Sequence, residues 1–111
     1  MIGPQLATLN AVIGVDRTHR LVTLMLDAIR DAEPDLREAV EQGDHARVAT
    51  LCHQLLGPAG SLGADELSAV CRRLEHAAAQ PEDDGLGALL VEWRTLARQA
   101  SCAFEQHLSA S

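Results

Sequence analysis

The sequence predicts an all-α protein, and both its composition and its patterning support this class. Alanine and leucine are abundant and β-branched residues are sparse, and the chain contains one Trp, one Phe and no Tyr. This composition favours helices over strands. Apolar residues recur at spacings of three and four along most of the chain, which is the period of an amphipathic helix. Because the expected helices are substantial and their connections short, we expect an antiparallel up-down four-helix bundle with a short accessory N-terminal helix.

The 111 residues, 47% of them hydrophobic, are enough for one modest core. We therefore expect residues 1–111 to form a single domain. The formal net charge is −7 and the nine basic residues are scattered arginines, which argues against a partner made of nucleic acid. The sequence has neither a membrane-spanning stretch nor a signal-peptide pattern. We expect a soluble, cytoplasmic protein without membrane contact.

The first predicted helix is short and ends near Gly14. Its apolar stripe is formed by Leu6, Leu9, Val12 and Ile13. Glycine is a common residue just beyond a helix C-terminus. We expect this helix to act as a lid on the bundle.

A longer pattern predicts one bent helix over residues 17–42. Asp16 is its expected N-cap, and Gly43 is its expected C-terminal stop. Pro34 lies inside the pattern, so a break at which Pro34 begins a second helix remains an alternative. The stripe expected to face the core consists of Leu21, Leu24, Met25, Ala28, Ile29, Ala32, Leu36, Ala39 and Val40.

Three further helices are expected after Gly43. Asp44 should cap the first of them, and the segment "GADELSAVCRRLEHAAAQP" predicts the second, with acidic residues in its first turn. The acidic loop "PEDDG" leads into the third, which repeats its apolar stripe for more than five turns. The residues expected to face inward are Val48, Leu51, Cys52, Leu55 and Ala59 in the first; Leu67, Val70, Cys71, Leu74 and Ala78 in the second; and Leu86, Leu89, Leu90, Trp93, Leu96, Ala97, Ala100, Phe104 and Leu108 in the third.

The aromatic residues and the cysteines are expected to be structural. Trp93 and Phe104 lie within an apolar stripe, which favours core packing over stacking on a ligand. Cys52, Cys71 and Cys102 lie on or near such stripes and form no CxxC pair. We expect them to be buried, reduced thiols.

His53 is the residue that the sequence singles out for function. On a helical wheel it projects off the core stripe toward a flank of its helix. Most of its neighbours there are as small as side chains can be, which would leave the imidazole accessible to a bulky protein partner. A second interpretation is a helix that ends at Leu56, since a following loop "GPAGSLG" explains every glycine without a function. The flank neighbours are Ala46, Ala49, Leu56, Gly57 and Gly60.

The segment "CHQLLGPAGSLGADEL" resembles the signature of histidine phosphotransfer (Hpt) domains. In that family the phosphorylated histidine is followed by x-Leu-Lys-Gly, two small residues, and then Gly, x, Leu, Gly and Ala. The flanking segments resemble the family as well, so the resemblance covers nearly the whole chain and implies a four-helix antiparallel bundle with an accessory N-terminal helix. The matching residues are His53, Leu55, Gly57, Ala59, Gly60, Leu62, Gly63, Ala64 and Leu67.

The resemblance implies a phosphorelay intermediate. His53 would accept a phosphoryl group from an aspartate of a response-regulator receiver domain and pass it to another receiver, and a hybrid sensor histidine kinase is a further implied partner. The receiver would supply Mg²⁺ and most catalytic groups, so this chain would bind no cofactor or metal and would be a carrier rather than an enzyme. We expect Gly57 and Gly60 to give clearance, and Gln54 to contact the phosphoryl oxygens or the partner. Leu56, Ala49 and Ala46 would join the partner-binding surface.

Two departures from the family pattern leave an alternative function open. Leu56 replaces the usual lysine, which would lie near the phosphoryl group as a positive charge. No local residue obviously replaces that charge, because Arg47 falls on another face of the helix and the sequence does not place Arg72 or Arg73. Pro58 also replaces a residue that can donate to the helix. The alternative is an Hpt-like module that binds a receiver or a kinase domain without being phosphorylated.

A metal-binding bundle is the third possibility, because the chain has five histidines and three cysteines. Carboxylate-bridged metal bundles place a Glu three residues before a His, and no Glu of this chain has that spacing. HExxH and CxxC are also absent. The sequence therefore gives this hypothesis little support.

Overall fold

The computed structural model describes residues 1–80 and 85–110, and five helices account for nearly all of them. No strand occurs within these two ranges, so the predicted all-α class is confirmed. Most of the "PEDDG" loop, residues 81–84, lies outside the described residues. The helices are α1 (Ile2–Ile13), α2 (Val15–Glu41), α3 (His45–Ser61), α4 (Asp65–Ala78) and α5 (Leu86–Ala110).

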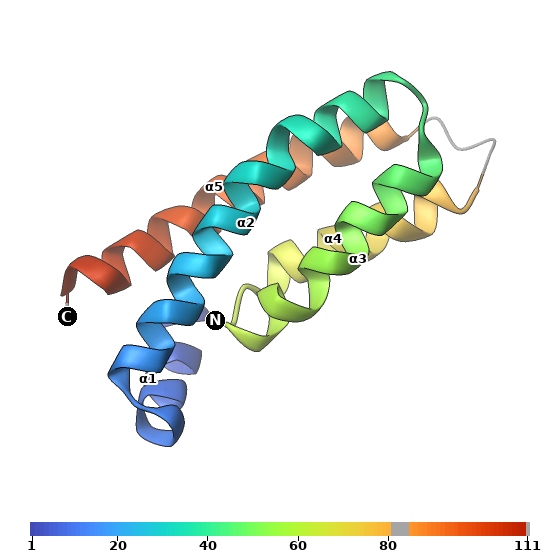
Figure 1. The fold of residues 1–111 in the computed structure, drawn as a ribbon. Helices are drawn as coiled ribbons and strands as arrows, with labels where there is room; N and C mark the ends of the chain where they lie inside the picture. Colours follow the sequence, from blue (N-terminus) through green and yellow to red (C-terminus); the bar gives the residue numbers. More distant parts are fainter. Residues whose placement is uncertain (81–84, 111) are drawn as a thin grey trace.

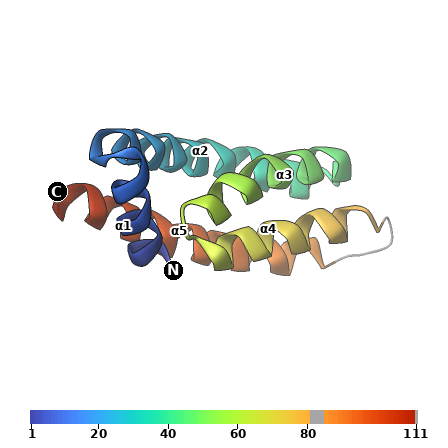
Figure 2. The same ribbon diagram turned by 90° about the horizontal axis from the view of Figure 1, so that it is seen from below.

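Helices α2 to α5 form an antiparallel up-down-up-down bundle (Figure 1). Helix α3 packs against α2 and α4, and α5 packs against the same two helices, so α3 and α5 lie diagonally opposite each other. The long helices α2 and α5 extend beyond the α3–α4 hairpin at one end, and α1 crosses the bundle there (Figure 2). The molecule is elongated, with extents of 46 × 20 × 17 Å.

Helix α1 is held to the bundle by one fully buried residue, by partly buried apolar residues that pack against the core, and by contacts at the α3–α4 turn. Leu6 is fully buried, and the Gln5 side chain donates a hydrogen bond to the carbonyl of Ser61 at 3.0 Å. Gly63 makes the turn with a φ of +86°, and a Cβ there would overlap the backbone of Met1. The placement of Val12 on the inner stripe was wrong. Val12 is 75% exposed, because it lies about 120° around the helix from Leu6.

Helix α2 is continuous across Pro34, so the alternative of a break at this residue is wrong. The helix begins at Val15, after Gly14 with a φ of +94°. Asp16 is therefore not the N-cap but a residue of the first turn, where its negative charge interacts favourably with the positive end of the helix dipole. The C-terminal stop is as predicted, since Gly43 follows the helix with a φ of +66°.

The buried face of α2 is narrower than predicted. Leu21 and Leu24 were expected to face the core, but they are 41% and 59% exposed. The residues that do reach the core form a stripe in which they are separated by four and three positions in strict alternation, a pattern typical of the seams of helix bundles. Leu21 and Leu24 lie beside that stripe, on the flank next to the end of α3. The buried stripe is Thr18, Val22, Met25, Ile29, Ala32, Leu36 and Ala39.

Helix α3 continues through Pro58 to Ser61. The alternative of a loop that begins after Leu56 is therefore wrong. Asp44 caps the helix as predicted, since its Oδ1 accepts a hydrogen bond from the backbone N–H of Arg47 at 3.1 Å. Pro58 is exposed and removes only the hydrogen bond to the carbonyl of Gln54, while its neighbour Ala59 remains fully buried. Burial of the inner face offsets the cost of this proline.

The core contains both aromatic side chains and two of the three cysteines. Trp93 and Phe104 are fully buried, which confirms their expected place. Cys52 and Cys71 are buried as well, and contact with Cys71 together with burial raises the pKa of the Cys52 thiol. Cys102 was expected to be buried but is exposed, because it lies on the outer face of α5, about 200° from Ala100. None of the helices described is long and apolar enough to cross a membrane.

Candidate functional site

His53 lies near the middle of α3, and 74% of its side chain is exposed to solvent. The core side of this helix is formed by Val48, Cys52, Leu55 and Ala59, which are all buried. The imidazole therefore stands on the flank of the helix, as its position on the helical wheel predicts. An exposed imidazole is available for chemistry with a second protein.

The ring of His53 is held by Glu75 of α4. The Nδ1 atom lies 3.1 Å from Oε1 and 3.4 Å from Oε2 of that carboxylate. A carboxylate can only accept hydrogen bonds, so Nδ1 carries the proton and donates it. The lone pair of the neutral ring is then on Nε2, for which no hydrogen-bond partner exists among the described residues. The arrangement presents one nucleophilic nitrogen in a fixed tautomer.

The small residues around His53 differ in what they do. Gly57 is exposed, and an added Cβ there would meet nothing within 4 Å, so this side of the ring has no covering side chain. Gly60 is half-buried, and an added Cβ would lie 3.4 Å from Oγ of Ser68. Its lack of a side chain thus also serves the close packing of α3 against α4. In the preceding turns, Ala49 is half-buried and Ala46 is exposed.

The two remaining candidates, Gln54 and Leu56, lie in different surroundings. Gln54 is exposed. Leu56 is half-buried and packs against the core, and its carbonyl accepts a hydrogen bond from Oγ of Ser68 at 2.8 Å. Leu56 thus occupies the position of the usual lysine with an apolar side chain that is partly withdrawn from solvent.

The three arginines of α3 and α4 differ in their ion-pair partners. Arg47 forms ion pairs with Glu38 at 2.9 Å and with Asp35 at 3.4 Å, so it is held toward α2. Arg73 forms an ion pair with Glu92 of α5 at 2.6 Å. Arg72 is exposed, and within the described parts of the chain it has no ion pair. Among the described residues, Arg72 is therefore the one of these three that is not held by a carboxylate.

An apolar groove adjoins the site of His53. Its walls come from the outer flank of α2 and from the last turns of α3, and it includes the exposed side chains of Leu21 and Leu24. Gly57 belongs to both the groove and the surroundings of His53. The groove residues are Leu21, Leu24, Met25, Ala28, Gly57, Pro58, Ser61 and Leu62.

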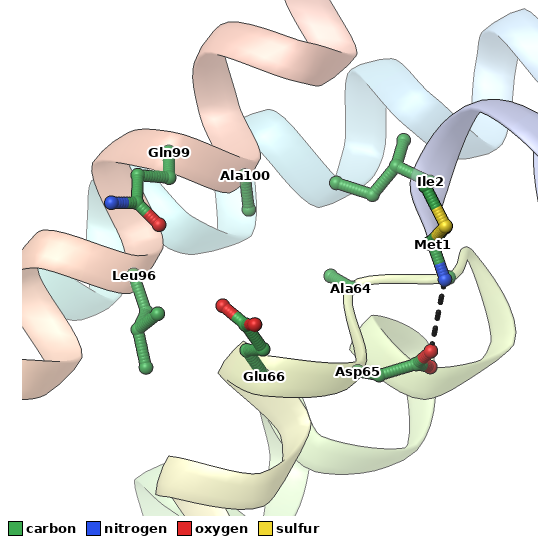
Figure 3. A pocket seen from close by; sticks show the side chains of 9 residues that line it. Met1, Ile2, Ala64, Asp65, Glu66, Leu96, Gln99 and Ala100 are labelled. Carbon is green, nitrogen blue, oxygen red and sulfur yellow. Dashed lines mark hydrogen bonds and ion pairs between the residues drawn. The ribbon is translucent and has the colours of Figure 1, made fainter.

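A second hollow lies near the N-terminus but has no comparable chemistry (Figure 3). The amino group of Met1 pairs there with Asp65 at 2.9 Å, and the other lining residues come from the start of α1, from the α3–α4 turn, from the start of α4 and from α5. In the described ranges of the chain, no three or more His, Cys, Asp or Glu side chains are grouped so that they could hold a metal ion. The surroundings of His53 are therefore the strongest candidate site.

Comparison with known families agrees with this geometry. The sequence model of the Hpt domain matches residues 20–108, which is most of the chain. The chain belongs to the Hpt domain family. Members of this family are histidine phosphotransfer carriers of phosphorelays, and they interact with response-regulator receivers and kinases. The Hpt domain match includes all of α3 and α4, and thus both His53 and Glu75.

A solved structure shares the fold of this Hpt domain. Histidine-containing phosphotransfer protein B (HptB) from Pseudomonas aeruginosa PAO1 superposes with a TM-score of 0.90 at 22% sequence identity. The alignment covers 98% of this chain and 94% of that protein. No curated protein sequence matches the chain. The likeness to HptB confirms the Hpt fold, including the accessory N-terminal helix.

Sequence reasoning missed Glu75 and the exposed leucines of the groove. Glu75 is 22 positions from His53, on another helix, so no local motif links the two. Leu21 and Leu24 were assigned to the core because they have helical spacing, although they lie beside the strict seam. The regular alternation of fours and threes from Thr18 to Ala39 was the signal that could have separated Leu21 and Leu24 from the core residues.

Proposed function

We propose that this Hpt domain accepts a phosphoryl group on Nε2 of His53 from the aspartyl phosphate of a response-regulator receiver and passes it to an aspartate of another receiver. The observation that carries the proposal is the exposed ring whose Nδ1–H is held by Glu75. This contact leaves the Nε2 lone pair pointing away from its partner carboxylate. A neutral imidazole nitrogen is an effective nucleophile near pH 7.

The transfer step uses this geometry directly. The Nε2 lone pair attacks phosphorus, the N–P bond forms, the bond from phosphorus to the aspartyl oxygen breaks, and the aspartate leaves as a carboxylate. The ring keeps its Nδ1 proton and becomes a cation. The carboxylate of Glu75, whose Oε1 lies 3.1 Å from Nδ1, stabilises this positive charge. Transfer to the next receiver reverses the same bond changes.

The domain would act as a carrier without catalytic machinery of its own. Phosphoryl transfer needs in-line placement of the reacting atoms and neutralisation of charge on the equatorial oxygens. We expect the receiver to supply Mg²⁺ for part of that neutralisation. The receiver domain of a hybrid sensor histidine kinase would be one such partner.

The receiver would dock on the apolar groove beside His53. Exposed leucines beside a glycine that leaves the backbone uncovered suit an apolar helix face of a partner. The surface around the ring would extend the contact through Gln54, Leu56, Ala49 and Ala46. In this arrangement Gly57 lets the partner backbone approach both the groove and the imidazole.

The direct test is phosphoryl transfer from a panel of receiver domains phosphorylated with acetyl phosphate. The wild-type domain should acquire an acid-labile, base-stable label, as phosphohistidine does, and His53→Ala should acquire none. His45→Ala is the matched control, because it removes another histidine of α3 and should keep the label. Label retained at the wild-type level in His53→Ala would end the assignment.

Substitution in the groove should weaken transfer without touching the histidine. Leu24→Asp is expected to raise the receiver concentration needed for half-maximal transfer about fivefold or more, because it places a charge where an apolar contact is expected. Val91→Asp, on α5 and also exposed, should change it little. Equal half-maximal concentrations in the two variants would show that the receiver docks elsewhere.

A binding module that is never phosphorylated is the second candidate, and Leu56 favours it. This position lacks the lysine that would stabilise phosphoryl oxygens. Leu56→Lys discriminates between the two functions. A carrier should accept phosphoryl groups faster after the change, whereas a pure binding module should show no phosphohistidine before or after it.

A further inference from the structure

We propose that Arg72 of α4 supplies the positive charge that position 56 of α3 lacks, by contacting the phosphoryl group carried on His53. This inference rests on the proposed phosphoryl transfer. It would make Arg72 a phosphate-contacting residue contributed by the helix that also holds the ring through Glu75.

Two contacts fix the face of α4 on which Arg72 lies. Ser68 bonds the carbonyl of Leu56, and Glu75 bonds Nδ1 of His53. Arg72 lies between them in sequence, about 40° around the helix from Ser68 and about 60° from Glu75. All three positions therefore belong to the side of α4 that borders α3, and Arg72 is on the solvent side of that border, where it is exposed.

Arg72 lies at the same level along the bundle axis as Leu56, the position at which the family usually has a lysine. Three residues separate Arg72 from Glu75, which corresponds to about 4.5 Å along a helix axis. Because α3 and α4 are antiparallel, a step of three residues from Glu75 back to Arg72 on α4 corresponds to a step of three residues from His53 forward to Leu56 on α3. The long arginine side chain thus starts beside the turn of Leu56 and Gly57, and an added Cβ at Gly57 would meet no atom within 4 Å.

The other arginines form ion pairs with carboxylates or belong to helices α2 and α5. Arg17 and Arg20 belong to the first two turns of α2, at the end of the bundle that α1 crosses, and Arg98 is on α5, diagonally opposite α3. The remaining five form ion pairs with carboxylates. These are Arg30 with Asp27, Arg37 and Arg94 with Glu33, Arg47 with Asp35 and Glu38, and Arg73 with Glu92.

A positive charge beside His53 would stabilise the phosphorylated form of the domain. A phosphoryl group on Nε2 brings up to two negative charges close to the carboxylate of Glu75, in a chain of net charge −7. A guanidinium can bond two phosphoryl oxygens at once, and it remains charged at any physiological pH. Arg72 is well suited to this role because no carboxylate of the described residues competes for it.

The experiment compares Arg72→Ala with Arg73→Ala, its neighbour, whose partner is on α5. The donors are the receiver that labels His53, phosphorylated with acetyl phosphate, and phosphoramidate, a small donor that needs no docking. Arg72→Ala should slow labelling of His53 about fivefold with both donors. A change in rate of this size is expected when one exposed ion pair is lost. Arg73→Ala should stay near the wild-type rate.

Restoring the lysine separates a phosphate contact from a structural role. Leu56→Lys should rescue labelling in the Arg72→Ala background, and it should increase the rate more in that background than in the wild type, because both cations would serve the same oxygens. Unchanged labelling in Arg72→Ala, a loss with the receiver alone, or failure of the rescue would each overturn the role of Arg72. Absence of label in the wild-type domain would instead overturn the proposed function.

Discussion

Replacing Glu75 with alanine is expected to slow phosphoryl transfer to His53 by about tenfold or more, while the bundle stays folded. The carboxylate fixes both the orientation of the ring and the proton on Nδ1 through contacts of 3.1 and 3.4 Å. Without it the ring can rotate and exchange tautomers, so the Nε2 lone pair is presented only part of the time. At metal sites, removing the group that orients a histidine ligand costs about 10- to 100-fold in metal affinity or activity. We expect an effect near the lower limit of that range here, because His53 is exposed.

Two variants test the cause of this effect. Glu75→Gln keeps an oxygen that accepts the Nδ1 hydrogen bond, so it should retain most of the wild-type rate if orientation matters more than charge. Glu92→Ala removes another partly exposed carboxylate that has a cationic partner and should leave the rate unchanged. The rates are measured as the initial labelling of His53 by a phosphorylated receiver. A rate in Glu75→Ala equal to that of the wild type would contradict the orienting role.

Replacing Trp93 with alanine is expected to lower the free energy of unfolding by about 3–5 kcal/mol, the range for deletion of a large buried aromatic side chain. Trp93 is fully buried in α5, and it is the largest side chain of the core. A small domain has a total stability of about 5–15 kcal/mol, so this single change would remove a large part of it. Urea unfolding followed by circular dichroism at 222 nm measures the loss.

A matched variant on the same helix provides the reference. Val91→Ala changes a side chain that is 64% exposed and should alter the free energy of unfolding by less than about 0.5 kcal/mol. Trp93→Phe, which keeps much of the ring volume, should fall between the two and should remain folded if Trp93→Ala does not. A loss below about 1 kcal/mol in Trp93→Ala would mean that the core does not depend on this residue.

The sequence indicated the fold class well because the strongest signal in a helical bundle is local. Helical spacing alone located each of the long helices to within a few residues. It could not tell which apolar residues of α2 reach the core, since Leu21 and Leu24 have the same spacing as their buried neighbours. Exposure depends on where the end of α3 lies, and that is a tertiary property.

The three glycines after His53 show the same limit. Gly57 leaves open space, Gly60 borders Ser68 of the neighbouring helix, and Gly63 makes a turn with positive φ against the N-terminus. In the sequence they form one series that fits either an exposed site or a loop. Their separate roles follow only from what lies opposite each backbone position.

The contact between His53 and Glu75 could not be predicted from the residues for a similar reason. It depends on the register in which α3 and α4 pair, and that register is set by the turn at Gly63 and by side chains of the core. The helical wheel could place His53 on a flank, but it carries no information about the facing helix. The wheel therefore predicted the exposed position of His53 and not its contact with Glu75.

The continuity of α3 through Pro58 has a further consequence for how a partner would be selected. His53 and the groove wall formed by Gly57, Pro58 and Ser61 belong to the same continuous helix α3. In the proposed complex, a receiver that binds in the groove would contact this wall, and that contact would set its distance and angle to the imidazole. Discrimination between competing receivers would then take place at the groove, several residues from the bond that forms. A change in the leucines could redirect the relay to another receiver without altering the chemistry.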